Sequence, residues 1–391
     1  MTTTSVPRSV PRSPASTLRR NPAAAWRHLD LVLVGAVVSI ACLGSLMVYS
    51  ATRGPTAPYR LTFLEKQVSY IGLGVIVMMV ATLVDYRVFR DWALLLYGSA
   101  CFLLLLVVSP LGSSSKGAQA WFQLGGFQLQ PSEFAKLGLI LAMGGLAAQF
   151  RGEIDVRRLG ALLAMGGLPL MLIMLQPDLG TALVLVAIIA GVLLVAGVQA
   201  RHLLALVLVA TIGVAGVLHS NVLKEYQTAR LTSFVSQDAS VKDNPELARA
   251  LYNVEQSKTA IGAGSLFGQG LFQGSQTRLG NVPEQHTDFI FTAVGEQLGF
   301  AGSATLLALF CIIAWRIWRT AQVARDPFGT LLCVGVLCLL MFQIFENVGM
   351  TMGIMPVTGI PLPFVSYGGS STIAEFAAIG LVMNVYARRF S

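Results

Sequence analysis

The sequence predicts an all-α integral membrane protein with about ten transmembrane helices, one long extracytoplasmic loop and both termini in the cytoplasm. Of the 391 residues, 54% are hydrophobic and only 12% are charged, whereas soluble domains carry about a quarter charged residues. Apolar runs of roughly 18 residues or more, the length that a bilayer requires, recur along the chain. Basic residues gather on alternate connections between these runs, as expected for loops that stay in the cytoplasm.

Residues 1–28 differ from the rest of the chain, because they are rich in Ser, Thr, Pro and Arg and poor in apolar side chains. Such a composition buries too little apolar surface to fold, so we predict a disordered basic cytoplasmic tail. Residues 29–391 then form one polytopic transmembrane domain. The first apolar segment is too long for a removable signal peptide and lacks a small-residue cleavage pattern.

The apolar segments after the tail have lengths suited to crossing a bilayer. In chain order they cover residues 29–50, 67–84, 92–109, 132–150, 159–175, 178–198, 202–220, 289–315, 328–349 and 367–386. An even number of spans puts both termini on one side, and the surplus of basic residues identifies that side as the cytoplasm. The basic residues of the short connections on this side and of the C-terminal tail are Arg151, Arg157, Arg158, Arg201, Arg388 and Arg389. The net charge of +8 is therefore mostly a topology signal, and we expect no nucleic acid partner.

The long outer loop covers about residues 221–287. Within it, residues 247–261 place apolar side chains at helical spacing, which predicts a helix lying at the outer membrane interface. The run GAGSLFGQGLFQG that follows, residues 262–274, is either a flexible connector or a place where the backbone approaches a ligand closely. A second irregular segment, residues 353–371, is dense in Pro and Gly, so it must be buried or line a cavity. Ser370 and Ser371 at its end are candidates to cap the last helix.

Cysteine and histidine give little sign of a metal site or a disulfide framework. The five cysteines all lie within apolar runs, which favours buried free thiols. The four histidines are scattered and form no HExxH-type cluster.

Ionisable residues inside apolar segments are functional candidates, because a charge in a bilayer is costly. They are Glu133, Lys136, Asp178, Asp288, Glu296, Glu346 and Glu375. Glu133 and Lys136 are spaced as an intrahelical ion pair, and alternatively Lys136 faces a cavity and meets an anionic headgroup. Asp178 follows a proline, which suits a helix N-cap, and a role in a cavity is the alternative.

Asp288 lies in NVPEQHTDFIFTAVGEQLGF, residues 281–300, at the outer mouth of an apolar segment. It is well placed as the N-cap of that segment or as a carboxylate facing a cavity. Glu296 follows two helical turns later, so both acids can share one face. A His286–Asp288 dyad is not expected, because the two side chains would point in different directions on a helix. His286 is expected to cap or position the loop.

Four motifs together resemble the SEDS family, which includes RodA, FtsW and SpoVE. They are AWFQLGGFQLQPSEFAKL, QPDLGTAL, PEQHTDFIF followed by GEQLGF, and NVGMTMGIMPVTGIPLPFVSYGGSS. The resemblance covers nearly all of the chain after the tail, and QSKTAIGAGSLFGQGLFQGSQ makes it more similar to the RodA branch. One departure is Gln297 in GEQLGF, where the family more often has a second acid.

This resemblance implies a peptidoglycan glycosyltransferase of the bacterial inner membrane that polymerises lipid II during cell elongation beside a class B penicillin-binding protein. Alternatives are an FtsW-like division enzyme, a lipid II flippase or transporter, and a recruiting scaffold. The resemblance implies that Asp288 is catalytic. The residues expected to bind or position substrate are Trp121, Glu133, Lys136, Asp178, Arg278, His286, Thr287, Ser366 and Ser370, with Lys116 as a weaker candidate. Membrane lipid is the other expected partner.

The chemistry of lipid II fits a single carboxylate. The donor linkage is α and the glycan product is β, so one inverting displacement suffices, and one base takes the proton of the attacking hydroxyl. The leaving pyrophosphate needs no protonating acid. It needs positive charge from a side chain or a divalent cation such as Mg²⁺ or Mn²⁺.

Overall fold

The computed structural model describes residues 29–389, apart from 55–58, 116–117, 126, 151–153 and 220–244. The predicted tail, the first part of the long outer loop, Lys116 and Arg151 therefore lie outside the described residues.

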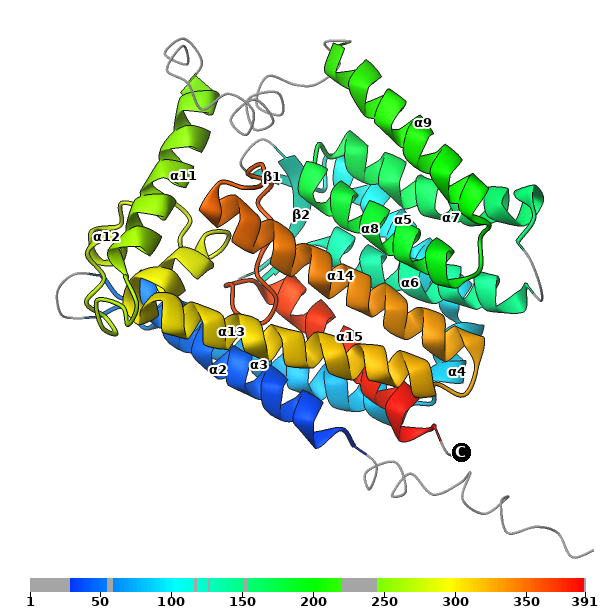
Figure 1. The fold of residues 1–391 in the computed structure, drawn as a ribbon, viewed down its shortest axis with the longest axis horizontal. Coiled ribbons are helices and arrows are strands. Elements are labelled where there is room, and N and C mark those ends of the chain that lie inside the picture. The colour runs from blue at the N-terminus through cyan, green and yellow to red at the C-terminus, as the bar shows by residue number, and fades with distance from the viewer. Residues whose placement is uncertain are drawn as a thin grey trace, which may run out of the picture.

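Every predicted apolar segment corresponds to a helix (Figure 1). These helices are α2 Leu31–Thr52, α3 Thr62–Leu83, α5 Ala93–Val108, α6 Pro131–Gln149, α7 Val156–Leu175, α8 Leu179–Val195, α9 Ala200–His219, α13 Ile290–Val323, α14 Pro327–Met352 and α15 Gly369–Ala387. Within the described ranges, six of them are long and apolar enough to cross a membrane: α2, α3, α7, α13, α14 and α15. The start of α2 and the end of α15 lie at the same end of the bundle (Figure 1). The chain is a multi-pass membrane protein with a helical body, and the total of ten spans stays a prediction.

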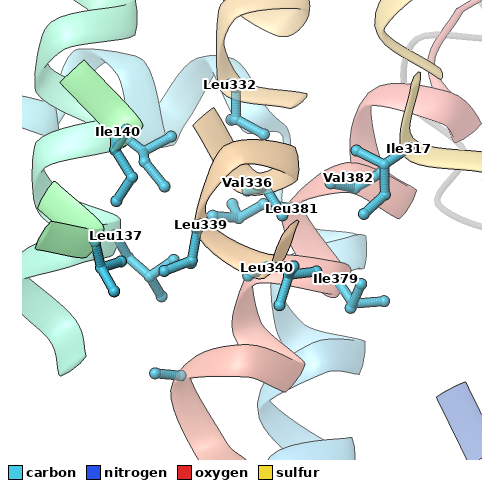
Figure 2. Packing of buried hydrophobic residues seen from close by; sticks show 14 of the residues in the cluster. Leu137, Ile140, Ile317, Leu332, Val336, Leu339, Leu340, Ile379, Leu381 and Val382 are labelled. Atoms are coloured by element: carbon cyan, nitrogen blue, oxygen red, sulfur yellow. The ribbon is translucent and has the colours of Figure 1, made fainter. Parts of the chain in front are cut away.

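The centre of the bundle is packed by branched aliphatic side chains. Figure 2 shows Leu137 and Ile140 of α6 beside Val336 and Leu339 of α14, with side chains of α15 on the other side of α14. Small residues let the helices approach closely, as is common in membranes. A Cβ on Gly380 of α15 would lie 2.6 Å from the carbonyl oxygen of Met78 on α3, so these two backbones are in contact.

The cysteines bear out only part of what their positions predict. All five carry free thiols. Cys42 and Cys311 are exposed on the outside of the bundle rather than buried, so the prediction of buried thiols is wrong for these two. Their apolar surroundings are explained by lipid-facing helix surfaces, where apolar residues do not need protein partners.

A small sheet is the element that the periodicity of the sequence did not predict. Strands β1 Ser113–Ser115, β2 Ala118–Leu124 and β3 Phe127–Leu129 pair in antiparallel order β1-β2-β3. Leu124 pairs with Phe127 across a two-residue turn, and Gly125 has a φ of +62°. A Gly-Gly pair between short alternating runs is a hairpin signal. This turn brings β3 back beside β2, which carries Trp121.

Helix α13 is broken near its outer end, at Gly299, where φ is 66° and ψ is −162°. The glycine-rich run packs against this break through backbone hydrogen bonds. The N–H groups of Gln269 and Gly270 donate to carbonyls of α13 at 2.9 and 3.2 Å. A Cβ on Gly268 would lie 2.1 Å from the carbonyl oxygen of Gln297. The close approach that glycine permits here is thus to the protein's own backbone, which replaces the bonds lost at the break.

The helix predicted within the outer loop is present as α11, Pro245–Ala263. Figure 1 shows α11 running across the direction of α13 and α14. Ser257 attaches it to both helices, because its hydroxyl lies 2.6 Å from the Thr292 hydroxyl and donates to the Thr351 carbonyl at 2.8 Å. A short helix, α12 Ser275–Leu279, follows before the segment that carries Asp288.

Candidate active site

A cavity of about 580 Å³ opens at the end of the bundle that the sequence predicts to be extracytoplasmic. Its walls come from the N-terminal parts of α3, α6, α8 and α15, from the sheet, from Glu284 and residues 286–288, and from residues 358–361. Eight of the residues predicted for the site line it together: Trp121, Glu133, Lys136, Asp178, His286, Thr287, Asp288 and Ser370. Motifs that are far apart in the sequence meet here because the N-terminal ends of these helices lie together.

Asp288 lies on the cavity wall and does not cap a helix. Helix α13 begins at Ile290, its N-cap position is Phe289, and no side chain caps it. The N-cap reading of Asp288 is therefore wrong, because the turn that precedes α13 continues one residue beyond it. A Cβ on Gly359 would lie 3.4 Å from Oδ2 of Asp288, so this glycine leaves space beside the carboxylate.

The backbone around Asp288 is fixed by the C-terminal third of the chain. Three consecutive carbonyl groups each accept a hydrogen bond from it: His286 from the Tyr367 N–H at 2.9 Å, Thr287 from the Ser366 hydroxyl at 2.5 Å, and Asp288 from Nδ2 of Asn347 at 2.8 Å. Ser366 also accepts from the Leu362 N–H at 2.8 Å. Ser366 is not among the residues that line the cavity; it lies behind the backbone that carries Asp288 and supports it.

Glu133 and Lys136 form the intrahelical ion pair that one alternative predicted, and Lys136 also lines a cavity, whereas its contact with an anionic headgroup stays a prediction. Nζ of Lys136 lies 2.8 Å from both carboxylate oxygens of Glu133. Both residues nevertheless line the cavity, with exposed fractions of 3% and 2%. Pro131 opens α6, and Glu133 lies in its first turn, where the helix dipole favours a negative charge. The pair therefore presents a cation at the cavity wall while most of its charge is compensated.

Asp178 is the N-cap of α8, as one reading of the sequence predicted. Its carboxylate accepts from the Thr181 N–H at 3.0 Å and from the Thr181 hydroxyl at 2.7 Å. It also lines the cavity. A capping role and a place at the site thus coincide, because α8 begins at the cavity.

Ser370 joins the sheet to the last helix and does not cap that helix. Its hydroxyl donates to the Gln128 carbonyl at 2.9 Å and accepts from the Gln130 N–H at 3.0 Å. The N-cap position of α15 is Gly368, with no side-chain cap, so the expectation that Ser370 or Ser371 caps this helix is wrong. These two hydrogen bonds hold the hairpin, which carries Trp121, against α15.

Arg278 and Glu296 lie away from this cavity. Arg278 lines a separate cavity of about 280 Å³ beside α2, together with Arg53 and Phe272. Glu296 is buried and turns toward α12, where it accepts from the Gln276 N–H at 2.6 Å and the Thr277 N–H at 2.9 Å. The expectation that Glu296 shares a face with Asp288 is therefore wrong, because Asp288 precedes the helix and Glu296 holds α12.

Aromatic residues form one wall that the sequence reasoning missed. Phe63 lies 5.0 Å from the His286 ring and 5.2 Å from the Tyr367 ring, and Tyr70 lies 6.0 Å from the Tyr367 ring. Burial raises the pKa of the Tyr367 hydroxyl above its usual value. Phe63, Lys66 and Tyr70 recur on one face of α3, and this helical spacing is the signal that could have found them.

The charges on the cavity wall are mostly acidic. Among the described residues, four carboxylates, those of Glu133, Asp178, Glu284 and Asp288, face two ammonium groups, those of Lys66 and Lys136. Within the described ranges, no group of three or more His, Cys, Asp or Glu side chains is placed to hold a metal ion.

Comparison with known proteins identifies the family. The model of the cell cycle protein family FtsW/RodA/SpoVE matches residues 30–390. The chain belongs to the FtsW/RodA/SpoVE family. A relative from Geobacter sp. (strain M18), named probable peptidoglycan glycosyltransferase FtsW, is 36% identical over 365 residues, covering 92% of this chain and 97% of its own. Peptidoglycan glycosyltransferase MrdB of Escherichia coli (strain K12) is 33% identical, covering 93% and 94%.

Solved structures of the FtsW/RodA/SpoVE family share this fold. The rod shape determining protein RodA of Thermus thermophilus superposes with a TM-score of 0.69 at 32% identity, covering 94% of this chain and 99% of its own. A chain from a structure described as the coordination of polymerization and crosslinking by a peptidoglycan synthase complex gives 0.78 at 32% identity, covering 93% and 99%. Family membership and the six apolar helices identify a multi-pass protein of the bacterial inner membrane.

Proposed function

We propose that this protein is a peptidoglycan glycosyltransferase that polymerises lipid II, with Asp288 as the general base. The observation that carries this is a carboxylate fixed by its backbone on the wall of a cavity at the outer end of a membrane bundle. The names of the relatives support the same activity. A lipid-linked sugar needs a site where the bilayer meets water, and the cavity lies at that depth.

The cavity wall has the groups that the inverting transfer requires. Asp288 takes the proton of the attacking sugar hydroxyl while the bond to the pyrophosphate breaks. The leaving pyrophosphate bears its own negative charge, which Lys136 and Lys66 compensate in part. Because carboxylates outnumber ammonium groups among the described residues of the wall, we also propose a divalent cation bound with the pyrophosphate, with Asp178 and Glu284 as its protein ligands. Trp121 and the aromatic wall offer apolar faces to the sugars.

The cellular role is proposed to be elongation, beside a class B penicillin-binding protein. The RodA-like motifs around the glycine-rich run support elongation, and the likeness to Thermus thermophilus RodA agrees with it. The synthase complex that couples polymerization with crosslinking supports a cross-linking partner. Expression in rod-shaped cells depleted of either RodA or FtsW tests the role: restored rod shape supports elongation, and restored division alone contradicts it.

The activity is tested by incubating the purified full chain with lipid II, with and without a divalent cation. We expect glycan polymer from the native protein, and a loss of about 10²- to 10⁴-fold in rate for Asp288→Asn, as is typical when a general base is removed. Asp155→Asn is the matched control, because Asp155 is a helix N-cap at the cytoplasmic end and accepts from the Arg158 N–H.

Two results would contradict the proposal. Polymerisation at the native rate by Asp288→Asn would show that another group is the base. The second is that no polymer forms with any cation, while the protein moves lipid II from one leaflet of a vesicle membrane to the other. The chain would then be a transporter and not a polymerase.

A further inference from the structure

We propose that Asn347 is a positioning residue that sets the place of the Asp288 carboxylate; this rests on the proposed function. Asn347 lies on α14 and is fully buried. Its Nδ2 donates to the Asp288 carbonyl at 2.8 Å and to the Ile360 carbonyl at 2.8 Å. One amide group therefore joins the segment that carries the base to the segment that faces it.

The orientation of this amide follows from its partners. Nδ2 carries two hydrogens, and both are used by the two carbonyl groups. A flipped amide would place Oδ1 against two carbonyl oxygens, which would repel it. In the orientation observed, Oδ1 of Asn347 is buried and has no hydrogen-bond partner among the described residues. Such a buried polar atom is unfavourable for stability, so this asparagine is better explained by what it positions than by stability.

The position of Asp288 depends on Asn347 because the base has no helix of its own. Asp288 lies in the turn before α13, whereas Asn347 lies on a helix whose neighbours bury it on several sides. A site residue held by a packed helix is placed more accurately than one held by a loop. Ile360 follows Gly359, which passes beside the Asp288 carboxylate. Loss of Asn347 would therefore release both sides of the narrow space around the base.

Asn347 is not on the cavity wall, so its loss should change turnover more than substrate binding. A displacement of about 1 Å at a reacting group can cost on the order of 100-fold in rate. Contacts of lipid II with Trp121, Lys136 and the aromatic wall would remain. The expected signature is a fall in kcat with little change in KM.

The chain contains a matched control at its other end. Asn384 lies on α15, is fully buried, and its Nδ2 also donates to two carbonyl groups, those of Ala81 and Val84. Residue type, burial and the two bonds donated by Nδ2 are the same, and Oδ1 of Asn384 in addition accepts from the Tyr86 N–H and from Arg388. Asn384 holds the end of α3 at the cytoplasmic side, far along the helices from the cavity.

The experiment compares Asn347→Leu with Asn384→Leu in the purified full chain, at a temperature where thermal unfolding shows both to be folded. We expect kcat for lipid II polymerisation to fall about 10- to 100-fold in Asn347→Leu, with KM within about threefold. Asn384→Leu should lower the melting temperature while its kcat stays near the native value. Equal kcat values for the two variants would overturn the proposal.

Hydrogen–deuterium exchange gives a second readout that does not depend on activity. Two amides of the turn, those of Thr287 and Phe289, donate to the Glu284 carbonyl. Asn347→Leu should speed exchange in peptides that cover residues 284–290, and Asn384→Leu should speed it near residues 81–86. Unchanged exchange at 284–290 would overturn the positioning role. Native kcat in Asn347→Leu beside an inactive Asp288→Asn overturns only this role, whereas an active Asp288→Asn overturns the proposed base.

Discussion

The two ends of the bundle contain the same kinds of side-chain contact in different surroundings. Each end has a buried ion pair, an asparagine that donates to two carbonyl groups, and a hydroxyl that joins two elements. At the outer end these groups surround a cavity of about 580 Å³. At the cytoplasmic end they join helices to one another.

The ion pairs show the difference most clearly. Arg316 of α13 lies 2.6 Å from Asp30, which also caps α2, and both are buried. Lys136 and Glu133 lie 2.8 Å apart and are buried as well, but they line the outer cavity. We therefore expect a functional role for the pair that faces a cavity and a structural role for the pair that does not line it. Burial and pairing alone do not distinguish the two pairs.

Breaking either ion pair should give the largest loss of stability. Lys136→Met leaves the Glu133 carboxylate buried and unpaired, and Arg316→Met does the same to Asp30. Removal of one partner from a buried pair typically costs about 3–5 kcal/mol. Thermal unfolding in detergent should show a similar fall in melting temperature for both variants.

Charge-neutral double variants should then separate the two ends. Glu133→Gln with Lys136→Met, and Asp30→Asn with Arg316→Met, remove both charges and should restore most of the stability. We expect the cytoplasmic double variant to polymerise lipid II at the native rate and the outer one to stay inactive. An active outer double variant would show that the Glu133–Lys136 pair is needed for stability only. The proposed difference between the two ends would then be wrong.

The helices were largely predictable from the sequence because a bilayer imposes long apolar segments. Each predicted segment corresponds to a helix, and α11 follows from its apolar stripe. Three of the acids on the cavity wall, Glu133, Asp178 and Asp288, were also predicted, whereas Glu284 was not. The surroundings of the acids could not be predicted. Asp288 precedes the start of α13 and Glu296 follows it, and periodicity does not give a helix start to within one residue.

Other parts of the site depend on long-range contacts that a single sequence does not show. Ser366 and Asn347 support the base from behind, and nothing in their local sequence distinguishes a support from a ligand. Tyr367 and His286 come from different loops and meet only after folding. The sheet is different, since the Gly-Gly turn did signal a hairpin, but short strands are hard to see beside long apolar runs.

Removal of the hydroxyl group that joins two elements at each end should give a smaller difference, in KM. Ser370→Ala removes the bonds that hold the hairpin of Trp121 to α15, a loss of about 1 kcal/mol, which corresponds to about fivefold in KM for lipid II. Thr82→Val is the control, because the buried Thr82 hydroxyl donates to Met78 and Gly380 carbonyls between α3 and α15. Its KM should stay native. A KM rise in both variants would mean that general loosening, and not the hairpin, weakens binding.

The smallest effect is expected from the pH dependence of stability at the cytoplasmic end. The Tyr86 hydroxyl donates to Asp326 at 2.7 Å, and burial, then this carboxylate, raises the pKa of Tyr86 to about 12. The folded state thus retains the Tyr86 proton more strongly than the unfolded state, whose pKa is near 10. The stability contributed by this proton is fully present below pH 10 and falls as pH rises from 10 toward 12.

Between pH 9 and 10.5 the loss from this one group should be below about 1 kcal/mol. Other tyrosines titrate in the same range, so the difference in melting temperature between the native chain and Tyr86→Phe isolates the contribution of Tyr86. That difference should narrow as pH rises, while Tyr367→Phe, at the cavity end, tests whether an outer tyrosine behaves alike. A constant difference between the native chain and Tyr86→Phe from pH 9 to 10.5 would show that the Tyr86–Asp326 bond does not hold this proton.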